Sequence, residues 1–199
     1  MPRFTNQAQL RYGNSVTNSN IAVGEILEVL SMTKTAVRDQ YDPNGPITYV
    51  ISILNSGTLP MNGLTLTDNL GAYASGTATL TPLNYLADSV KYYVNGVLQP
   101  SAVVTAGPPL VVSGITVPAG GSVTVVYEAA VNEFAPLDTT SVINNTAIVA
   151  GTGITPITAE EEITVESTPV LTITKSVSPV PVTENGTLTY TFLIQNSGN

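Results

Sequence analysis

A lysine on the apolar side of an alternating segment constrains the fold of this chain more than any other feature. Residues 30–36 read Leu-Ser-Met-Thr-Lys-Thr-Ala, so in a strand Lys34 shares a face with leucine, methionine and alanine. An unpaired charge on a buried face is costly. The pattern returns in residues 171–177, where Lys175 is in register with leucine, isoleucine and valine. We therefore expect a β-structure in which a buried lysine has a specific partner.

The composition favours a β-sandwich and excludes several classes of function. Of the 199 residues, 43% are hydrophobic, and segments rich in strand-forming residues are separated by turn-forming residues. There is no cysteine or histidine, which excludes disulfides, cysteine nucleophiles, serine–histidine relays and the common zinc sites. A net charge of −8, with only six Lys plus Arg, disfavours binding to nucleic acid or to an acidic membrane surface.

Alternating segments bounded by turn residues predict strands along the chain, and no segment forms a convincing amphipathic helix. Residues 4–12 and 21–30 are expected to pair as a hairpin across a polar loop that contains Asn18 and Asn20. Asn95 and Gly96 indicate a two-residue hairpin turn. No segment has the length of a membrane helix, and no signal peptide is visible at the start.

The two ends of the chain repeat parts of its middle. Lys34 matches Lys175, and Asn-Ser-Gly at 55–57 matches 196–198, both at an offset of 141 residues. Asn6 matches Asn145 at an offset of 139 residues. We predict one complete repeat at 29–166, an arm at 1–28 equivalent to the end of a preceding repeat, and the opening strands of a following repeat at 167–199.

Three polar residues are placed on the apolar faces of predicted strands: Lys34 and Asp68 by alternation, and Asn145 by its match to Asn6, because alternation alone fits Asn144 equally well. Burial disfavours the charged forms of lysine and aspartate, so a neutral amine and a protonated acid are expected. The amine can attack the asparagine carbonyl while Asp68 donates to the oxygen where charge develops. Loss of ammonia would leave an amide between Lys34 and Asn145. These residues therefore form a candidate autocatalytic isopeptide triad.

Short motifs along the chain resemble a known family. Thr-Lys-Thr at 33–35, Leu-Thr-Asp-Asn-Leu at 66–70 and Asn-Thr-Ala at 145–147 are similar to the bacterial surface repeats catalogued as domain of unknown function eleven. The resemblance implies an immunoglobulin-like antiparallel β-sandwich in tandem arrays on bacterial cell or spore surfaces. The three polar residues also resemble the isopeptide arrangement of Gram-positive adhesins and pilins, which implies the same roles for them here.

We expect the protein to be a structural subunit of an extracellular fibre or stalk, with further copies of itself as the partner. The N-terminal arm would be donated to a neighbouring subunit, giving head-to-tail growth. Asn6 and Lys175 are the candidates for contact between subunits. The strand equivalent to 66–68 is missing from the C-terminal copy, so docking without a covalent bond is expected there. No cofactor and no metal are required.

A surface adhesin that presents loops to a glycan or protein ligand is the main alternative. Tyr92 and Tyr93 beside the 95–96 turn could form an exposed aromatic patch, although ordinary strand positions are the simpler interpretation. Asp39, Asp42 and Asn44 could bind calcium through oxygen ligands, although an acidic turn is the simpler interpretation.

An enzyme is the third alternative. Without histidine or cysteine, a carboxylate pair such as Asp88 and Glu133 would be the leading candidate for catalysis. Nothing in the sequence fixes the separation of these two residues, so we expect no enzymatic activity on an external substrate.

Overall fold

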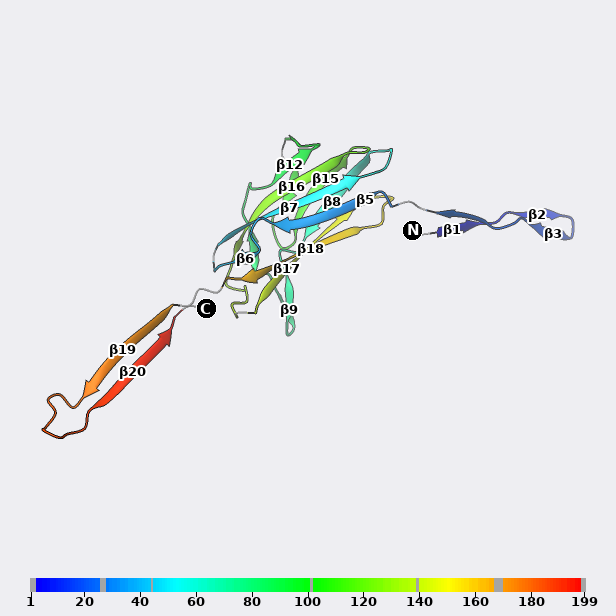
Figure 1. The fold of residues 1–199 in the computed structure, drawn as a ribbon. Helices are drawn as coiled ribbons and strands as arrows, with labels where there is room; N and C mark the ends of the chain where they lie inside the picture. The colour runs from blue at the N-terminus through cyan, green and yellow to red at the C-terminus, as the bar shows by residue number, and fades with distance from the viewer. Residues whose placement is uncertain are drawn as a thin grey trace.

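The protein is described by a computed structural model that covers residues 3–25, 28–43, 45–100, 102–138, 140–166 and 170–197. Every regular element in this part of the chain is a β-strand. A two-sheet sandwich forms the centre, and a hairpin arm extends from each end of it (Figure 1). The described residues contain no helix long and apolar enough to span a bilayer. The predicted all-β, immunoglobulin-like sandwich is confirmed.

The first sheet of the sandwich has the strand order β13-β12-β16-β7-β5, with β11 also paired to β16, and all pairs are antiparallel. The bounds are β5 Leu30–Ala36, β7 Pro46–Asn55, β11 Leu83–Tyr85, β12 Lys91–Val94, β13 Val97–Leu98 and β16 Ser122–Val131. The turn between β12 and β13 holds Asn95 and Gly96, both with positive φ, as the predicted two-residue hairpin requires.

The second sheet has the order β14-β15-β8-β17-β18-β6, in which only the edge pair β18-β6 is parallel. The bounds are β6 Gln40–Tyr41, β8 Met61–Asp68, β14 Val103–Thr105, β15 Leu110–Val117, β17 Val142–Ala150 and β18 Ile157–Val165. A short hairpin, β9 Tyr73–Ser75 with β10 Ala78–Leu80, follows β8.

The core lies between the two sheets and is built from alternate residues of the long strands. In β7 and β16, residues 47, 49, 51 and 53 and residues 123, 125, 127 and 129 are fully buried, while their neighbours are half-buried or exposed. The second sheet contributes its own alternate residues from β8, β15 and β17. Burying one face of every strand in this way is the source of the period-two pattern in the sequence.

The N-terminal arm differs in detail from the predicted hairpin. The chain turns back at Gly13, so that β2 Gln9–Tyr12 pairs with β3 Ser15–Asn18, and β1 Arg3–Asn6 pairs with β4 Ala22–Glu25. The expected loop around Asn18 is therefore partly strand. Gly13, at a φ of 58°, supplies the left-handed backbone that a tight turn needs. The C-terminal arm is one long hairpin, β19 Leu171–Ser178 with β20 Thr189–Asn196.

The hairpins of both arms repeat the strand registers of the sandwich. Asn6 faces Ala22 as Asn145 faces Glu161, so β1-β4 has the register of β17-β18 at an offset of 139. Lys175 faces Phe192 as Lys34 faces Ile51, so β19-β20 has the register of β5-β7 at an offset of 141. The division of the chain at 28/29 and 166/167 stays a prediction, and these registers agree with it.

Candidate functional site

Lys34 lies on the inner face of β5, where its side chain has no exposure to solvent. Its Nζ donates to Asp68 Oδ2 at 2.7 Å, which is the only buried ion pair among the described residues. The Nζ also lies 4.9 Å from the centroid of the Tyr49 ring, within reach of a cation–π interaction. The counter-ion of the inward lysine is therefore Asp68, on the opposite sheet, and a covalent partnership of Lys34 with Asn145 stays a prediction.

Asp68 ends β8, and each of its carboxylate oxygens has a different role. Oδ1 accepts the backbone N–H of Leu70 at 3.0 Å, which closes the tight turn after the strand and fixes the carboxylate. Oδ2 accepts from Lys34 and also from the Tyr127 hydroxyl at 2.7 Å. The residue is fully buried. One oxygen atom therefore connects two proton donors of the first sheet.

Asn145 projects inward from β17, and both ends of its amide are hydrogen-bonded. Oδ1 accepts the backbone N–H of Gly71 at 3.1 Å, and Nδ2 donates to the Tyr127 hydroxyl at 3.0 Å. The Gly71 N–H is also within 2.9 Å of Asn69 Oδ1, so the amide of this turn is shared. The donor to the asparagine oxygen is the backbone amide of Gly71, whereas the sequence suggested Asp68 for this role.

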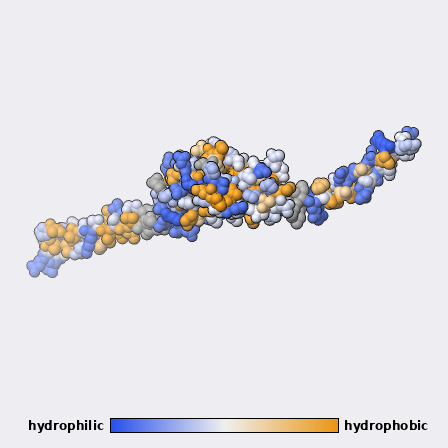
Figure 2. All heavy atoms as spheres, turned by 90° about the horizontal axis from the view of Figure 1, so that it is seen from above, coloured by the Kyte–Doolittle hydropathy of each residue, from blue (hydrophilic) through white to orange (hydrophobic). Residues whose placement is uncertain are grey.

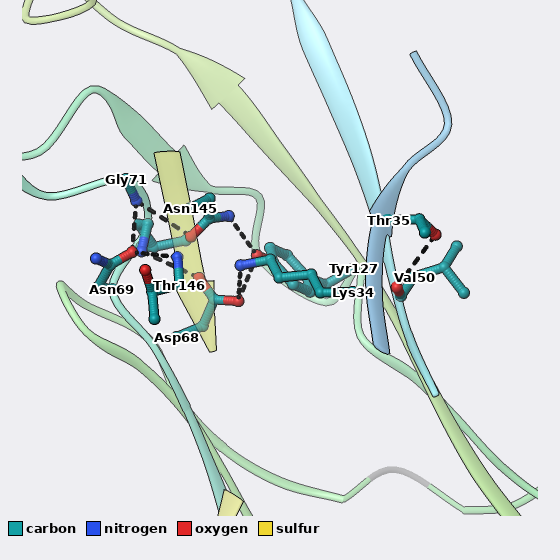
Figure 3. Close-up of polar contacts among 10 residues, drawn as sticks. Lys34, Thr35, Val50, Asp68, Asn69, Gly71, Tyr127, Asn145 and Thr146 are labelled. Carbon is teal, nitrogen blue, oxygen red and sulfur yellow. Dashed lines mark hydrogen bonds and ion pairs between the residues drawn. The ribbon is translucent and has the colours of Figure 1, made fainter. Parts of the chain in front are cut away.

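Figure 3 shows the four side chains meeting between the sheets, with the Tyr127 hydroxyl placed between the Asp68 carboxylate and the Asn145 amide. Lys34 and Tyr127 come from β5 and β16 of the first sheet, and Asp68 and Asn145 come from β8 and β17 of the second. The structure thus brings the three predicted residues into one buried network. Any bond between Lys34 and Asn145 would join the two sheets.

Sequence reasoning missed the two tyrosines of the site. Tyr127 and Tyr49 stack with ring centroids 5.4 Å apart and an interplanar angle of 24°. Both are on the apolar faces of their strands, which placed them in the core without indicating a role for the hydroxyl groups. The sequence did offer one signal for such a role. Each tyrosine places a hydroxyl on an inward face, in a core where a buried acid and a buried amide were also predicted.

Burial controls the ionisation of the site. Desolvation lowers the pKa of Lys34 to about 8, although Asp68 and Glu161 favour its charged form and offset part of this effect. Glu161, on β18, accepts the backbone N–H of Ala36 at 3.0 Å beside the site. Desolvation also raises the pKa of Tyr127 well above its usual value, with the Asp68 charge as a second cause. A neutral amine is therefore accessible near neutral pH, and the phenol keeps its proton.

The fourth buried polar residue of the described chain, Asn55, has a structural role. Its Nδ2 donates to backbone carbonyls of Leu59, Val117 and Pro118, and its Oδ1 accepts the N–H of Gly57. Its side-chain bonds go to the backbone of two turns, at 57–59 and at 117–118, so it ties these turns together at one end of the sandwich.

The remaining predicted residues lie apart from this network. Asn6 and Lys175 are exposed on β1 and β19, at opposite ends of the molecule, and are not brought together within one chain (Figure 1). Lys175 lies over the rings of Tyr190 and Phe192, at 4.3 and 5.3 Å from their centroids.

The residues proposed for the alternative functions lie outside this buried network. Asp88 and Glu133 are exposed, in separate turns. Asp42 pairs with Arg38 at 3.4 Å, Asn44 lies outside the described residues, and no group of three acidic residues gathers as a metal site in the part of the chain that the structure describes. Tyr92 and Tyr93 are half-buried strand residues.

Two solved structures of pilins share this fold. A variant of BcpA, the major pilin subunit of Bacillus cereus, matches with a TM-score of 0.52 and 9% identity, covering 97% of this chain and 63% of that chain. BcpA itself matches with a TM-score of 0.50 and 13% identity, covering 85% and 49%. The present chain thus spans less than two thirds of either structure. No family model and no curated protein matches the sequence. At these identities the likeness shows the fold alone.

Proposed function

We propose that this protein is a structural subunit of an extracellular bacterial surface fibre, and that its sandwich is locked by an amide bond between Lys34 and Asn145. The observation that carries the proposal is the buried network in which Lys34 is linked to Asn145 through Asp68 and Tyr127. A buried ion pair is by itself weak evidence for stability, because desolvation of the two charges opposes their attraction. A role in bond formation gives this costly arrangement a purpose.

The reaction needs no external reagent. The neutral amine of Lys34 attacks Asn145 Cγ, the Nζ–Cγ bond forms, the Cγ–Nδ2 bond breaks, and the nitrogen leaves as ammonia. Folding itself brings the reacting groups together in a dry site, which can supply much of the required reduction in barrier. The product closes a loop of 111 residue steps (145 − 34). By analogy with a disulfide across a loop of that size, the bond would stabilise the fold by about 5 kcal/mol.

The C-terminal arm supports the assembly part of the proposal. Leu171, Ile173, Phe192 and Ile194 lie on the same hairpin face as Lys175, and each of these apolar residues is at least half exposed. The equivalent face of β5 and β7 is part of the core of the sandwich. Figure 2 shows hydrophobic atoms gathered along this arm. An apolar face of this kind on a two-stranded sheet requires a covering partner.

We propose that the partner is the N-terminal arm of a second copy. In the sandwich, Glu161 of β18 accepts the backbone N–H of Ala36 in β5. This contact lies beside the Lys34 network, to which β17 contributes Asn145. The β1-β4 hairpin has the register of β17-β18 and exposes Phe4, and Leu10 is exposed on the adjoining β2. Docking it on β19-β20 would repeat the internal contact between subunits and extend the chain head to tail. No acidic residue lies on the face of Lys175 within β19 and β20, so this contact would be non-covalent.

Mass spectrometry of the intact protein tests the cross-link. The wild type should be lighter than its sequence mass by one ammonia, and Lys34→Ala should have its full mass. Trypsin should fail to cut after Lys34 and should yield a branched peptide that contains Asn145. Ammonia loss that persists in Lys34→Ala would come from elsewhere, for example from a succinimide at Asn95-Gly96, and would refute the cross-link.

Electron microscopy and sedimentation of the same preparation test the assembly. Head-to-tail docking predicts concentration-dependent filaments. A protein that stays monomeric at high concentration and binds a glycan or host protein would instead support the adhesin alternative.

A further inference from the structure

We infer that Tyr127 is a catalytic residue of the cross-linking reaction, and that it carries the proton that the leaving nitrogen of Asn145 requires. This inference rests on the proposed Lys34–Asn145 bond. An amide nitrogen leaves as ammonia only after it gains a proton, while the attacking amine must lose one. The question is therefore how a proton travels from one nitrogen to the other inside a dry core.

The hydrogen bonds supply a continuous path between the two nitrogens. Lys34 Nζ lies 2.7 Å from Asp68 Oδ2, the same Oδ2 lies 2.7 Å from the Tyr127 hydroxyl, and that hydroxyl lies 3.0 Å from Asn145 Nδ2. A carboxylate can only accept, so the phenolic proton points at Asp68. The lone pair of the hydroxyl then accepts from Nδ2. Among the described residues, Asp68 makes no direct hydrogen bond to the Asn145 nitrogen.

The remaining contacts leave Asp68 and Tyr127 free for proton transfer. The Gly71 N–H already donates to Asn145 Oδ1, where negative charge develops as the amine attacks, so it acts as an oxyanion donor. The Leu70 N–H holds the other carboxylate oxygen of Asp68. Within the described part of the chain, Asp68 Oδ2 thus bonds to Lys34, which supplies the proton, and to Tyr127, which passes it on to Asn145.

The transfer balances in three steps that start from the neutral amine. Lys34 Nζ adds to Asn145 Cγ, and the nitrogen, now positively charged, gives one proton to Asp68 Oδ2. Protonated Asp68 donates to the Tyr127 oxygen, the hydroxyl turns toward Asn145 Nδ2, and Asp68 passes its proton to Tyr127 while the phenolic proton passes to Nδ2. Finally the Cγ–Nδ2 bond breaks, ammonia leaves, and the amide keeps one proton on Nζ. Tyr127 and Asp68 both end as they began.

Tyr127 suits this role because it remains neutral while it exchanges protons. Burial and the adjacent carboxylate both raise the pKa of its hydroxyl, so a lasting phenolate is disfavoured. Its ring is held by stacking on Tyr49, which keeps the hydroxyl in place between the two groups.

Tyr41 provides a matched control. It is equally buried, but its hydroxyl donates to the backbone carbonyl of Pro136, outside the network of Lys34 and Asn145. Tyr127→Phe and Tyr41→Phe each remove one hydroxyl from a buried ring. Only the first interrupts the proton path.

The experiment follows ammonia loss by intact mass after a pulse of cell-free synthesis of the full chain. We expect Tyr127→Phe to slow the reaction by about 100-fold, within the usual range for a positioned proton donor, and Tyr41→Phe to react at nearly the wild-type rate. A Tyr127→Phe protein that cross-links as fast as the wild type would overturn the inference and leave the proposed function intact. A wild type that never loses ammonia would overturn both.

A second measurement needs no variant and covers the case in which Tyr127→Phe does not fold. The wild-type rate is measured in mixtures of light and heavy water. Because two protons move together when Asp68 and Tyr127 pass them on, the rate should fall along a curve as deuterium increases. A linear dependence would mean that one proton moves, and would refute the relay.

Discussion

At the scale of single residues, the site is built around the cost of burying a lysine. Lys34 pairs with Asp68, but its pKa still lies below that of an ordinary lysine, because the loss of hydration outweighs the attraction of Asp68 and Glu161. The same burial that makes the charged pair expensive makes the neutral amine available. A site that would be a poor stabiliser as an ion pair is therefore well arranged to react.

The first prediction concerns pH. Lys34 loses its proton as the pH rises through about 8, so the neutral, attacking form becomes more abundant in that direction. Each pH unit below this value lowers the neutral fraction about tenfold. Ammonia loss in freshly made wild-type protein should therefore accelerate from about pH 6 to about pH 8 and then level off. A rate that falls over this range would contradict a neutral-amine mechanism.

The second prediction concerns Asp68→Asn. The variant keeps the shape of the side chain but leaves the buried Lys34 without a counter-charge, which typically costs ~3–5 kcal/mol. It should also fail to lose ammonia, since the carboxylate that accepts the lysine proton is gone. Urea unfolding and intact mass measure the two effects.

Asp42→Asn is the matched control for this substitution. Its ion pair with Arg38 is 3.4 Å long and solvent-exposed, so its loss should cost less than about 1 kcal/mol. Similar losses of stability for the two variants would contradict a special role for the buried pair.

At the scale of strands and turns, alternation predicted most of the sandwich. It gave the inward faces of β5, β7, β8 and β16, and with them the burial of Lys34 and Asp68. In β17 alternation alone did not distinguish Asn144 from Asn145, and the match of Asn145 to Asn6 in the repeat decided for Asn145. It missed β15, an eight-residue strand, because the pattern changes parity within it. Leu110 and Val112 face inward, as do Ile115 and Val117, and Gly114 lies between them at a φ of 79° where the register shifts. A bulge inserts an extra residue, so the inward-facing positions no longer alternate regularly, and a search for period-two alternation misses the strand.

The site itself was predictable only in part for a similar reason. Alternation states which face a residue is on, so together with the repeat it identified three inward polar side chains. It does not state which residues of different strands meet across the sandwich, and so it gave no role to Tyr127. The Gly71 amide could not be predicted either, because its position depends on the geometry of the turn after β8.

The third prediction concerns this turn. Gly71 has a φ of 72°, and a Cβ added there would lie 2.6 Å from Ile143 Cγ2. Gly76 has a φ of 62° with nothing within 4 Å. Each change to alanine should lower the free energy of unfolding by ~1–2 kcal/mol, because alanine disfavours the left-handed backbone conformation. Gly71→Ala should cost about 1–3 kcal/mol more, because β17 must shift. Equal losses on urea unfolding would show that the close contact is unimportant.

At the scale of the whole molecule, a finished sandwich sits between two arms that repeat parts of it. Each arm has the strand register of a pair within the core but lacks the opposing sheet, so residues that are buried in the sandwich are exposed in the arms. The sandwich buries its apolar faces between its own two sheets, whereas the apolar faces of the arms stay exposed. Interactions between molecules should therefore depend on the arms.

The fourth prediction tests this dependence. Phe192→Ser removes an aromatic side chain that is 56% exposed on the apolar face of the C-terminal hairpin. If that face binds a second copy, sedimentation should show association weakened by at least about tenfold, the effect expected from the loss of one aromatic anchor. Thr191→Ser, on the opposite face of the same strand, should assemble normally. Equal assembly of both variants would place the contact elsewhere.

The strands that hold Lys34 and Asn145 also determine how a cross-linked subunit responds to tension. The chain enters the sandwich on β5 and leaves it through β17 and β18, so an amide between those strands would carry a pulling force past everything in between. The shielded 111 residue steps would otherwise extend by roughly 380 Å, at about 3.4 Å each. A fibre of such subunits would keep its length under load and would yield only at the joints between copies.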